Sequence, residues 1–260
     1  MEPTSAESLA IWNRIAGWWD GVLGEGNEFQ RELIMPSTDR LLAIQPGESV
    51  LDACCGNGNY SRRLVVQGAK VIAFDGAAPF IEAAKKRSPE NSIEYHVIDA
   101  TSAFDLEKIP SRTFDAAVCS MALMDLPTIT PLLESVFRSL KANGRFVLSI
   151  PHPCFNSNRT KMTAELITDQ GQMRQNYGIS ISHYITPFTE PSSGLLNQPE
   201  PHFIFHRPIK EWVNAFTAVG FVIDAIDEPT FTEPAKNTNT FSWKKRSEIP
   251  PVMLFRLVAR

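Results

Sequence analysis

Three aspartates stand at the ends of short apolar segments in the first half of the chain. They are Asp52, Asp75 and Asp99, and the first of them is followed by Gly56 and Gly58. A carboxylate can accept hydrogen bonds from ligand hydroxyls or attract a positive charge. Glycines in a tight turn let a ligand approach the backbone, because no Cβ blocks it. The combination predicts a binding site for a small polar molecule.

Two classes of ligand compete for the glycine turn. Read as the dinucleotide pattern GxGxxG, residues 56–61 have Ser61 where the third glycine should stand. A pyrophosphate is negative and binds at a helix N-terminus, so the Asp52 carboxylate would repel it. S-adenosyl-L-methionine carries an ammonium and a sulfonium and has no phosphate, so a nearby carboxylate attracts it. Asp52 therefore favours S-adenosylmethionine as the cofactor over a nicotinamide dinucleotide.

Residues 52–58 resemble the first motif of the class I S-adenosylmethionine-dependent methyltransferases, an acid followed by spaced glycines. Cys54 stands where that family has its first glycine. The resemblance is strong over residues 46–150 and weaker over 207–221 and the end of the chain. It implies that Asp75 contacts the ribose hydroxyls. The full set of cofactor contacts that it predicts is Trp19, Asp52, Cys54, Gly56, Asn57, Gly58, Asp75, Gly76, Asp99, Ala100, Ser120 and Met121.

Within that set the resemblance assigns different parts of the cofactor to different strand ends. Asp99 and Ala100 match the positions that hold the adenine, and Ser120 and Met121 match those that line the methionine and methyl end. Similar methyltransferases often cover the methionine end with an aromatic residue that precedes the first strand, which favours Trp19 as a contact. The alternative for Trp19 is a role as a core anchor.

The elements that must position these residues alternate between strand and helix. Apolar segments of strand length occupy residues 49–53, 70–75, 93–99, 114–120, 144–150, 221–225 and 252–258. Helical patterns occupy residues 60–66, 79–87, 129–140 and 208–219. This alternation predicts an α/β fold with a Rossmann-like, mostly parallel seven-stranded sheet and helices on both faces. Open sheets of this kind bind ligands at the carboxyl ends of their strands, where the three acids fall.

Four regions follow from the same patterns. Residues 1–45 read as a helical cover, with a second helix over 28–42 and a break at residues 21–27. Residues 46–150 form the cofactor-binding core, and residues 206–260 complete the sheet. Residues 151–205 are rich in Pro, Ser, Thr, Asn and Gln and show weak periodicity. So long a stretch predicts an inserted substrate lid, subdomain or mobile loop.

The candidates for work on a methyl acceptor follow the fourth and fifth strands or lie in the insertion. Methyl transfer is an in-line displacement, so the protein must align the acceptor, and it needs a base only if the acceptor keeps its proton. Asp125 and His152 are the predicted catalytic residues; a helix cap and a structural histidine are the respective alternatives. Tyr184, His202 and His206 are the predicted substrate contacts in the wall of a pocket.

Composition narrows the remaining possibilities. The 260 residues carry a net charge of −4 without a basic run, which argues against a nucleic-acid partner. The four cysteines form no CxxC pair, so no metal site is expected. The chain begins without a basic and apolar signal segment and has no apolar run of about 20 residues. We therefore expect a cytoplasmic protein without a membrane partner, as a monomer or homodimer.

Taken together, the sequence predicts an enzyme that moves a methyl group from S-adenosylmethionine to an oxygen or nitrogen atom of a small molecule. A non-catalytic regulator that holds S-adenosylmethionine is the first alternative. An NAD-type oxidoreductase is a weaker one.

Overall fold

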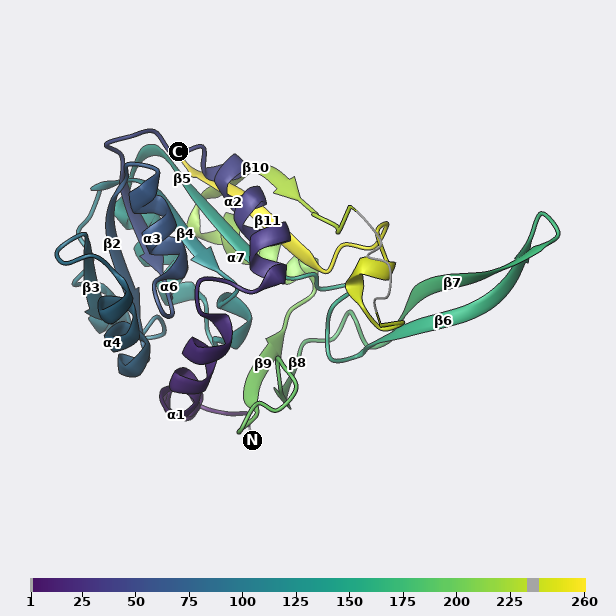
Figure 1. The fold of residues 1–260 in the computed structure, drawn as a ribbon. Coiled ribbons are helices and arrows are strands. Elements are labelled where there is room, and N and C mark those ends of the chain that lie inside the picture. Colours follow the sequence, from purple (N-terminus) through teal and green to yellow (C-terminus); the bar gives the residue numbers. More distant parts are fainter. Residues whose placement is uncertain (1, 233–238) are drawn as a thin grey trace.

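A seven-stranded sheet forms the centre of the computed structural model, which describes residues 2–232 and 239–260 (Figure 1). Its order is β10-β11-β5-β4-β1-β2-β3. All neighbouring strands are parallel except β11, which runs antiparallel to both β10 and β5. The predicted α/β fold with a mostly parallel sheet is confirmed. The strands are β1 (Ser49–Ala53), β2 (Lys70–Asp75), β3 (Ile93–Val97), β4 (Phe114–Ser120), β5 (Leu140–Pro151), β10 (Phe221–Asp227) and β11 (Val252–Ala259).

The sheet order reverses direction beside β1. The chain adds β2 and β3 on one side of β1 and then crosses back to place β4 on the other side. The connections that leave β1 and β4 therefore separate at the carboxyl ends of the strands and leave a crevice there, which is where open α/β sheets bind ligands. The glycine turn after β1 lies at this crevice.

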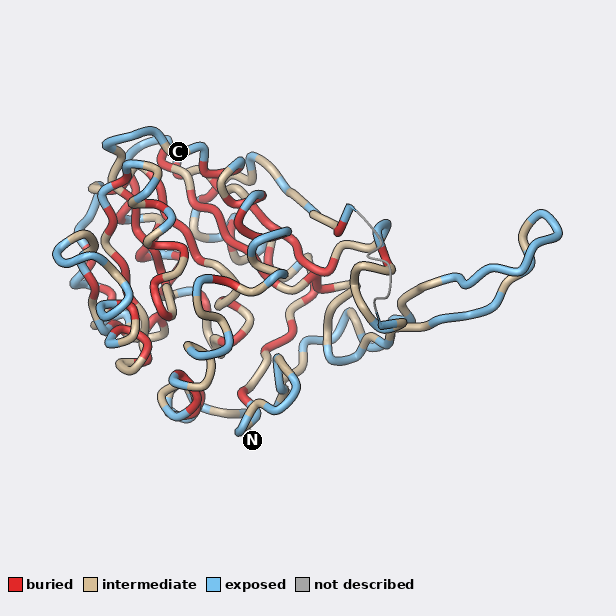
Figure 2. Tube along the Cα trace, viewed as in Figure 1, coloured by how far each residue is buried: buried red, intermediate tan, exposed pale blue. Residues whose placement is uncertain are grey.

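Helices cover the two faces of the sheet in two sets. Buried residues of α2 (Met35–Leu42), α3 (Asn59–Val66) and α4 (Ala78–Arg87) pack on one face. Those of α5 (Ala103–Leu106), α6 (Thr130–Ser139) and α7 (Ile209–Val219) pack on the other. Because successive side chains of a strand point to opposite faces, Val50 joins the first cluster and Leu51 the second. Figure 2 shows these buried layers in red.

The N-terminal region of the described chain is mostly helical. Helix α1 (Ser5–Leu23) begins with a capping box between Thr4 and Glu7 and ends at Gly24. It packs against α4 and β9 (Figure 1). The single helix expected over residues 28–42 is instead a π-helical turn, η1 (Gln30–Ile34), that continues into α2.

Residues 151–205, for which weak periodicity predicted a lid, subdomain or mobile loop, contain two hairpins. Strands β6 (Thr160–Asp169) and β7 (Gln172–Ile181) form a ribbon that projects from the body of the molecule, mostly exposed (Figures 1 and 2). Strands β8 (Phe188–Ser192) and β9 (His202–His206) form the second hairpin, beside α1.

A two-residue turn connects the two strands of the ribbon. Gln170 and Gly171 have φ of 49° and 79°, the paired positive values of a two-residue hairpin turn. The register places Met162 opposite Ile179 and Ala164 opposite Tyr177 on one face, so that face is apolar.

No helix among the described residues is long and apolar enough to cross a bilayer.

Candidate active site

A cavity of about 600 Å³ opens at the carboxyl ends of β1, β2 and β4. Its size is within the range of about 300–1,000 Å³ that is usual for small-molecule sites. Helix α1, the loop after β4 and the β8–β9 hairpin close around it. The predicted site residues that line it are Trp19, Asp52, Cys54, Gly56, Asn57, Asp75, Gly76, Asp99, Ala100, Ser120, Met121, Asp125, His202 and His206.

The glycine turn reaches its shape through alternating left-handed residues. Cys54, Gly56 and Gly58 have φ of 55°, 55° and 73°. A non-glycine residue in this region costs about 1–2 kcal/mol, so Cys54 keeps the family's turn at the cost of backbone strain. Gly58 does not line the cavity. A Cβ on Gly58 would overlap the Tyr95 hydroxyl oxygen, so this glycine is required for packing of the turn rather than for direct ligand contact.

Asp75 joins the end of β2 to the glycine turn. Its Oδ2 accepts a hydrogen bond from the Gly56 N–H at 2.9 Å, and its Oδ1 accepts one from the Ala77 N–H at 2.9 Å. A carboxylate offers about four acceptor positions, so both oxygens can still receive a ligand hydroxyl. Burial raises the pKa of Asp75 to about 6, against the opposing effect of the two N–H donors.

Asp52 lies deeper, beneath the turn. Its side chain is buried, and its Oδ2 accepts a hydrogen bond from the Ser61 hydroxyl. Burial and the neighbouring Asp75 charge raise the pKa of Asp52 to about 7. A cationic ligand in the cavity would lower this pKa, because an opposite charge favours the ionised carboxylate.

The charge of the cavity discriminates between ligand classes. Four of its described lining residues are aspartates, Asp52, Asp75, Asp99 and Asp125, and one, Arg207, is a lysine or arginine. The Arg207 guanidinium donates to the carbonyls of Leu126 and Pro127 at 2.8 and 2.9 Å, so it is held by the backbone. Such a cavity attracts a cation and disfavours a pyrophosphate.

Asp99 lies just beyond β3, which ends at Val97 rather than at residue 99 as expected. Its Oδ1 accepts hydrogen bonds from the Thr101 N–H at 2.8 Å and the Thr101 hydroxyl at 2.7 Å. The Ile98 N–H donates to the Asp75 carbonyl at 3.1 Å. This bond places the third acid beside the second.

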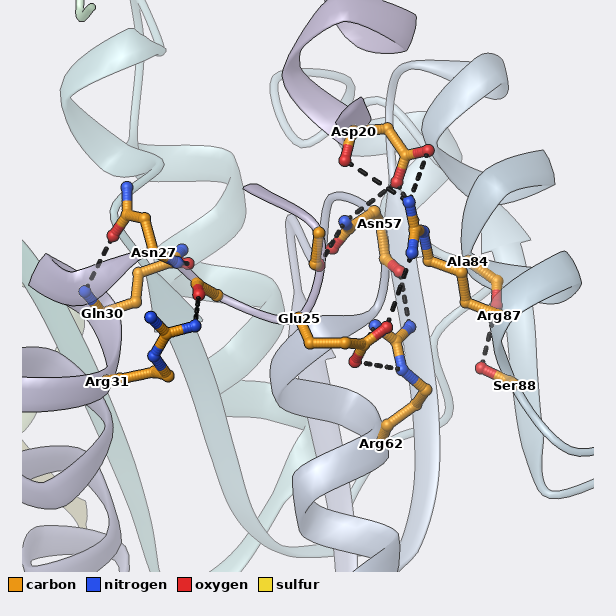
Figure 3. A network of polar contacts seen from close by, with 12 residues as sticks. Asp20, Glu25, Asn27, Gln30, Arg31, Asn57, Arg62, Ala84, Arg87 and Ser88 are labelled. Carbon is orange, nitrogen blue, oxygen red and sulfur yellow. Dashed lines mark hydrogen bonds and ion pairs between the residues drawn. The ribbon is translucent and has the colours of Figure 1, made fainter. Parts of the chain in front are cut away.

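Polar contacts hold α1 against the glycine turn (Figure 3). The Asn57 amide donates to Asp20 Oδ1 and to the Gly24 carbonyl, each at 3.0 Å. Asp20 also pairs with Arg87 at 2.7 Å, and Glu25 pairs with Arg62 at 2.9 Å. The contacts bring Trp19 to the cavity. They form a latch, by which we mean the contacts of Asp20 and Glu25 with Asn57, Arg62 and Arg87.

Asp125 and His202 form a close pair in the lining of the cavity. Asp125 ends the short helix η2 (Leu123–Asp125), and His202 begins β9. His202 Nε2 lies 3.6 Å from Asp125 Oδ1, and this oxygen is buried without a hydrogen-bond partner in the described part of the chain. Burial and the Asp75 charge raise the pKa of Asp125 well above its usual value. Burial lowers the pKa of His202 to about 4.

His152, a predicted catalytic residue, does not line the cavity. Its Nε2 lies 2.7 Å from Glu228 Oε1, its Nδ1 accepts the Cys154 N–H at 3.1 Å, and its ring stacks on Phe155. Both ring nitrogens are therefore used in holding the loop after β5. Their placement corrects the predicted catalytic role to a structural one, which was the alternative for this residue.

Two predicted substrate contacts are also engaged in the lid. Tyr184 does not line the cavity, and its hydroxyl oxygen accepts the Ile209 N–H at 3.0 Å at the start of α7. His206 lines the cavity, but its Nε2 bonds to the Tyr184 carbonyl at 2.9 Å and its ring stacks on Phe188. Tyr184 thus lies outside the cavity, whereas His202 and His206 line it.

Sequence reasoning missed Asn59 and Ser8. Asn59 begins α3 and lines the cavity, and its Nδ2 is a buried donor without a partner in the residues described. Its signal was present, since it follows Gly58 in the motif. Ser8 Oγ donates to the Asp125 carbonyl at 3.1 Å across 117 residues, a contact that no local pattern could indicate.

Over residues 2–232 and 239–260, no group of three or more His, Cys, Asp or Glu could hold a metal ion.

The known proteins to which this chain is similar are methyltransferases. Residues 51–148 match the family model described as a methyltransferase domain. A demethylmenaquinone methyltransferase of Clavibacter sepedonicus is 31% identical over 144 residues, which cover 54% of this chain and 56% of the relative. A ubiquinone biosynthesis O-methyltransferase of Xanthomonas campestris pv. campestris is 30% identical over 145 residues, covering 54% and 57%. The chain spans about half the length of the curated relatives it matches.

A solved S-adenosylmethionine-dependent methyltransferase from Mesorhizobium loti superposes with a TM-score of 0.65 at 23% identity. It covers 86% of this chain and 96% of its own. At this identity the superposition shows a shared fold.

Proposed function

We propose that the chain is a class I S-adenosylmethionine-dependent methyltransferase and that it transfers a methyl group to an oxygen or nitrogen atom of a small molecule. The observation that carries this proposal is the charge of the cavity, with four aspartates against one backbone-held arginine. A cationic cofactor without phosphate fits that balance.

The residues present fit S-adenosylmethionine. Asp75 retains acceptor positions for the ribose hydroxyls, and Asp99 with Ala100 would border the adenine. The unpartnered Asn59 amide is a donor suited to the carboxylate of the methionine part. Trp19 would close over the methionine end, where α1 excludes water. When bound, the cofactor supplies a methyl carbon that is already electrophilic because it is attached to a sulfonium.

For the acceptor we propose a hydroxylated aromatic ring. Trp12, Phe205 and Trp212 line the cavity and offer flat apolar surfaces to such a ring. Asp125 and His202 supply the polar groups at the same end. The names of the two curated relatives refer to menaquinone and ubiquinone, which supports ring compounds of this class.

Calorimetry with S-adenosylhomocysteine tests the cofactor assignment. We expect saturable binding by the natural protein and at least tenfold weaker binding by Asp75→Asn, because an amide presents one acceptor atom where the carboxylate presents two. Asp169→Asn, at the tip of the β6–β7 ribbon, is the matched control and should bind like the natural protein.

The acceptor is then sought with methyl-labelled S-adenosylmethionine and a panel of phenols, quinols and aromatic amines. Transfer of label to a panel member supports the proposal. Absence of S-adenosylhomocysteine binding, together with quenching of NADH fluorescence by the protein, would overturn it in favour of an oxidoreductase.

A further inference from the structure

Gln198, in the loop between β8 and β9, holds the His202 ring in one tautomer. Its Oε1 accepts the Gly194 N–H at 3.0 Å, and its Nε2 donates to the Glu200 carbonyl at 2.6 Å. These two backbone groups fix the orientation of the amide, because a flip would place oxygen against a carbonyl and NH₂ against an N–H. The same Nε2 lies 3.0 Å from His202 Nδ1.

An amide nitrogen only donates, so His202 Nδ1 must accept. A neutral imidazole then carries its proton on Nε2. Burial keeps the ring neutral near pH 7, since it lowers the pKa of His202 to about 4. Packing holds the ring in place, with Trp12 4.8 Å away between centroids and the ring only about 5% exposed.

The protonated Nε2 lies 3.6 Å from Asp125 Oδ1. With its proton in place, Nε2 has no lone pair to offer to an incoming acid. His202 therefore cannot remove a proton from a molecule in the cavity. Ser8 donates to the backbone carbonyl of Asp125, which leaves the side-chain oxygens free of that hydroxyl.

We propose that Asp125 is the catalytic base for the methyl acceptor, and that Gln198 and His202 are positioning residues that direct a donor at its carboxylate. This inference rests on the function proposed above. An oxygen lone pair of the acceptor forms the bond to the methyl carbon while the carbon–sulfur bond breaks and leaves its electron pair on sulfur. The hydroxyl proton passes to Asp125 and from there to solvent.

Two opposing groups act on the Asp125 carboxylate. Asp75 faces it with a like charge and, together with burial, raises its pKa. The His202 Nε2–H lies just beyond hydrogen-bond distance of Oδ1, and an approach of a few tenths of an ångström would let it donate and favour the ionised form. A raised pKa makes the carboxylate a stronger base than an exposed aspartate. Its buried Oδ1, without a partner in the described part of the chain, is the oxygen that would accept the proton of a phenol.

Nitrogen NMR of histidine in the cofactor-free protein tests the tautomer. We expect His202 to show an unprotonated Nδ1 and a protonated Nε2. In Gln198→Glu the new carboxylate accepts from Nδ1, so the ratio of the two tautomers should reverse by about tenfold or more. Gln172→Glu, the same change on the exposed β7 strand, should leave the His202 signals unchanged. A natural protein with Nδ1 protonated, or identical signals in Gln198→Glu, would overturn the assignment.

A carboxyl carbon titration tests the consequence for Asp125, whose signal is identified by its loss in Asp125→Asn. It should titrate at higher pH in Gln198→Glu than in the natural protein, because the donor has been lost. Asp125→Asn should also reduce transfer to the acceptor found in the panel by about 10²–10⁴-fold when S-adenosylmethionine is saturating. Retained transfer would refute the base. A failure of the proposed function would show instead as lost cofactor binding with the tautomer unchanged.

Discussion

The strongest constraint on the glycine turn is the lack of space at Gly58, which predicts a large cost for Gly58→Ala. The φ of 73° costs an alanine about 1–2 kcal/mol relative to glycine. Its Cβ would also overlap the Tyr95 hydroxyl oxygen and lie 3.0 Å from the Ala84 Cβ. Overpacking of this kind adds about 1–3 kcal/mol. We expect the free energy of unfolding to fall by about 2–5 kcal/mol, a large part of the roughly 5–15 kcal/mol of a typical domain.

Urea denaturation measures this loss, and Gly171→Ala is the matched control. Gly171 has a similar φ of 79°, but a Cβ added there would meet nothing within 4 Å, so only the backbone cost of about 1–2 kcal/mol applies. The double variant Gly58→Ala/Tyr95→Phe removes the overlapping oxygen and should recover part of the difference. If Gly58→Ala lost no more stability than Gly171→Ala, the steric reasoning would be refuted.

Three further outcomes follow from the site. Gly56→Ala, with open space around its Cβ and φ of 55°, should lose only about 1–2 kcal/mol of stability but weaken S-adenosylhomocysteine binding at least tenfold in calorimetry, because its methyl group enters the cavity wall. The raised pKa of Asp52, about 7, means that the folded protein holds a proton that the unfolded chain releases near pH 4; this stabilisation is full below about pH 4 and is lost as the pH rises through 7. The free energy of unfolding of Asp52→Asn, minus that of the natural protein, should therefore rise between pH 5 and 8. A difference that stays constant over this range in urea denaturation would contradict the expectation. Asp20→Asn weakens the latch by removing the ion pair with Arg87, which should speed S-adenosylhomocysteine release in stopped-flow experiments by about two- to fivefold; Asp169→Asn, which removes the exposed pair with Arg174, should not change the rate.

The extent of successful prediction differs between the core and the insertion. Apart from the short helix α5, which was not predicted, the strands and helices of residues 46–150 lie within a few residues of their predicted bounds, because apolar periodicity reports burial on each face. The β6–β7 ribbon was missed although Met162, Ala164 and Leu166 alternate with polar residues. Its apolar face is largely exposed rather than covered by a core, so composition suggested a loop where local pairing forms a hairpin.

The same difference applies within the site. Asp75 and Gly56 could be paired in advance, since both stand at strand ends that a parallel sheet brings to one edge. His152 stands at an equivalent strand end, yet its ring turns toward Glu228, 76 residues away. The direction of the His152 ring depends on a partner far along the chain, and the pattern of a strand does not indicate such a partner.

The sequence by itself determined the sheet, the left-handed turn after its first strand and the acids gathered at its edge, because these depend on local backbone preferences and on the alternation of buried side chains. Only the tertiary structure decided which histidine meets Asp125, and with which nitrogen. The nitrogen is chosen by contacts of Gln198 with Gly194, Glu200 and His202 inside the β8–β9 loop. The approach of His202 to Asp125 depends on how β9 packs against η2, 77 residues earlier in the chain, and no spacing of residue types encodes that packing.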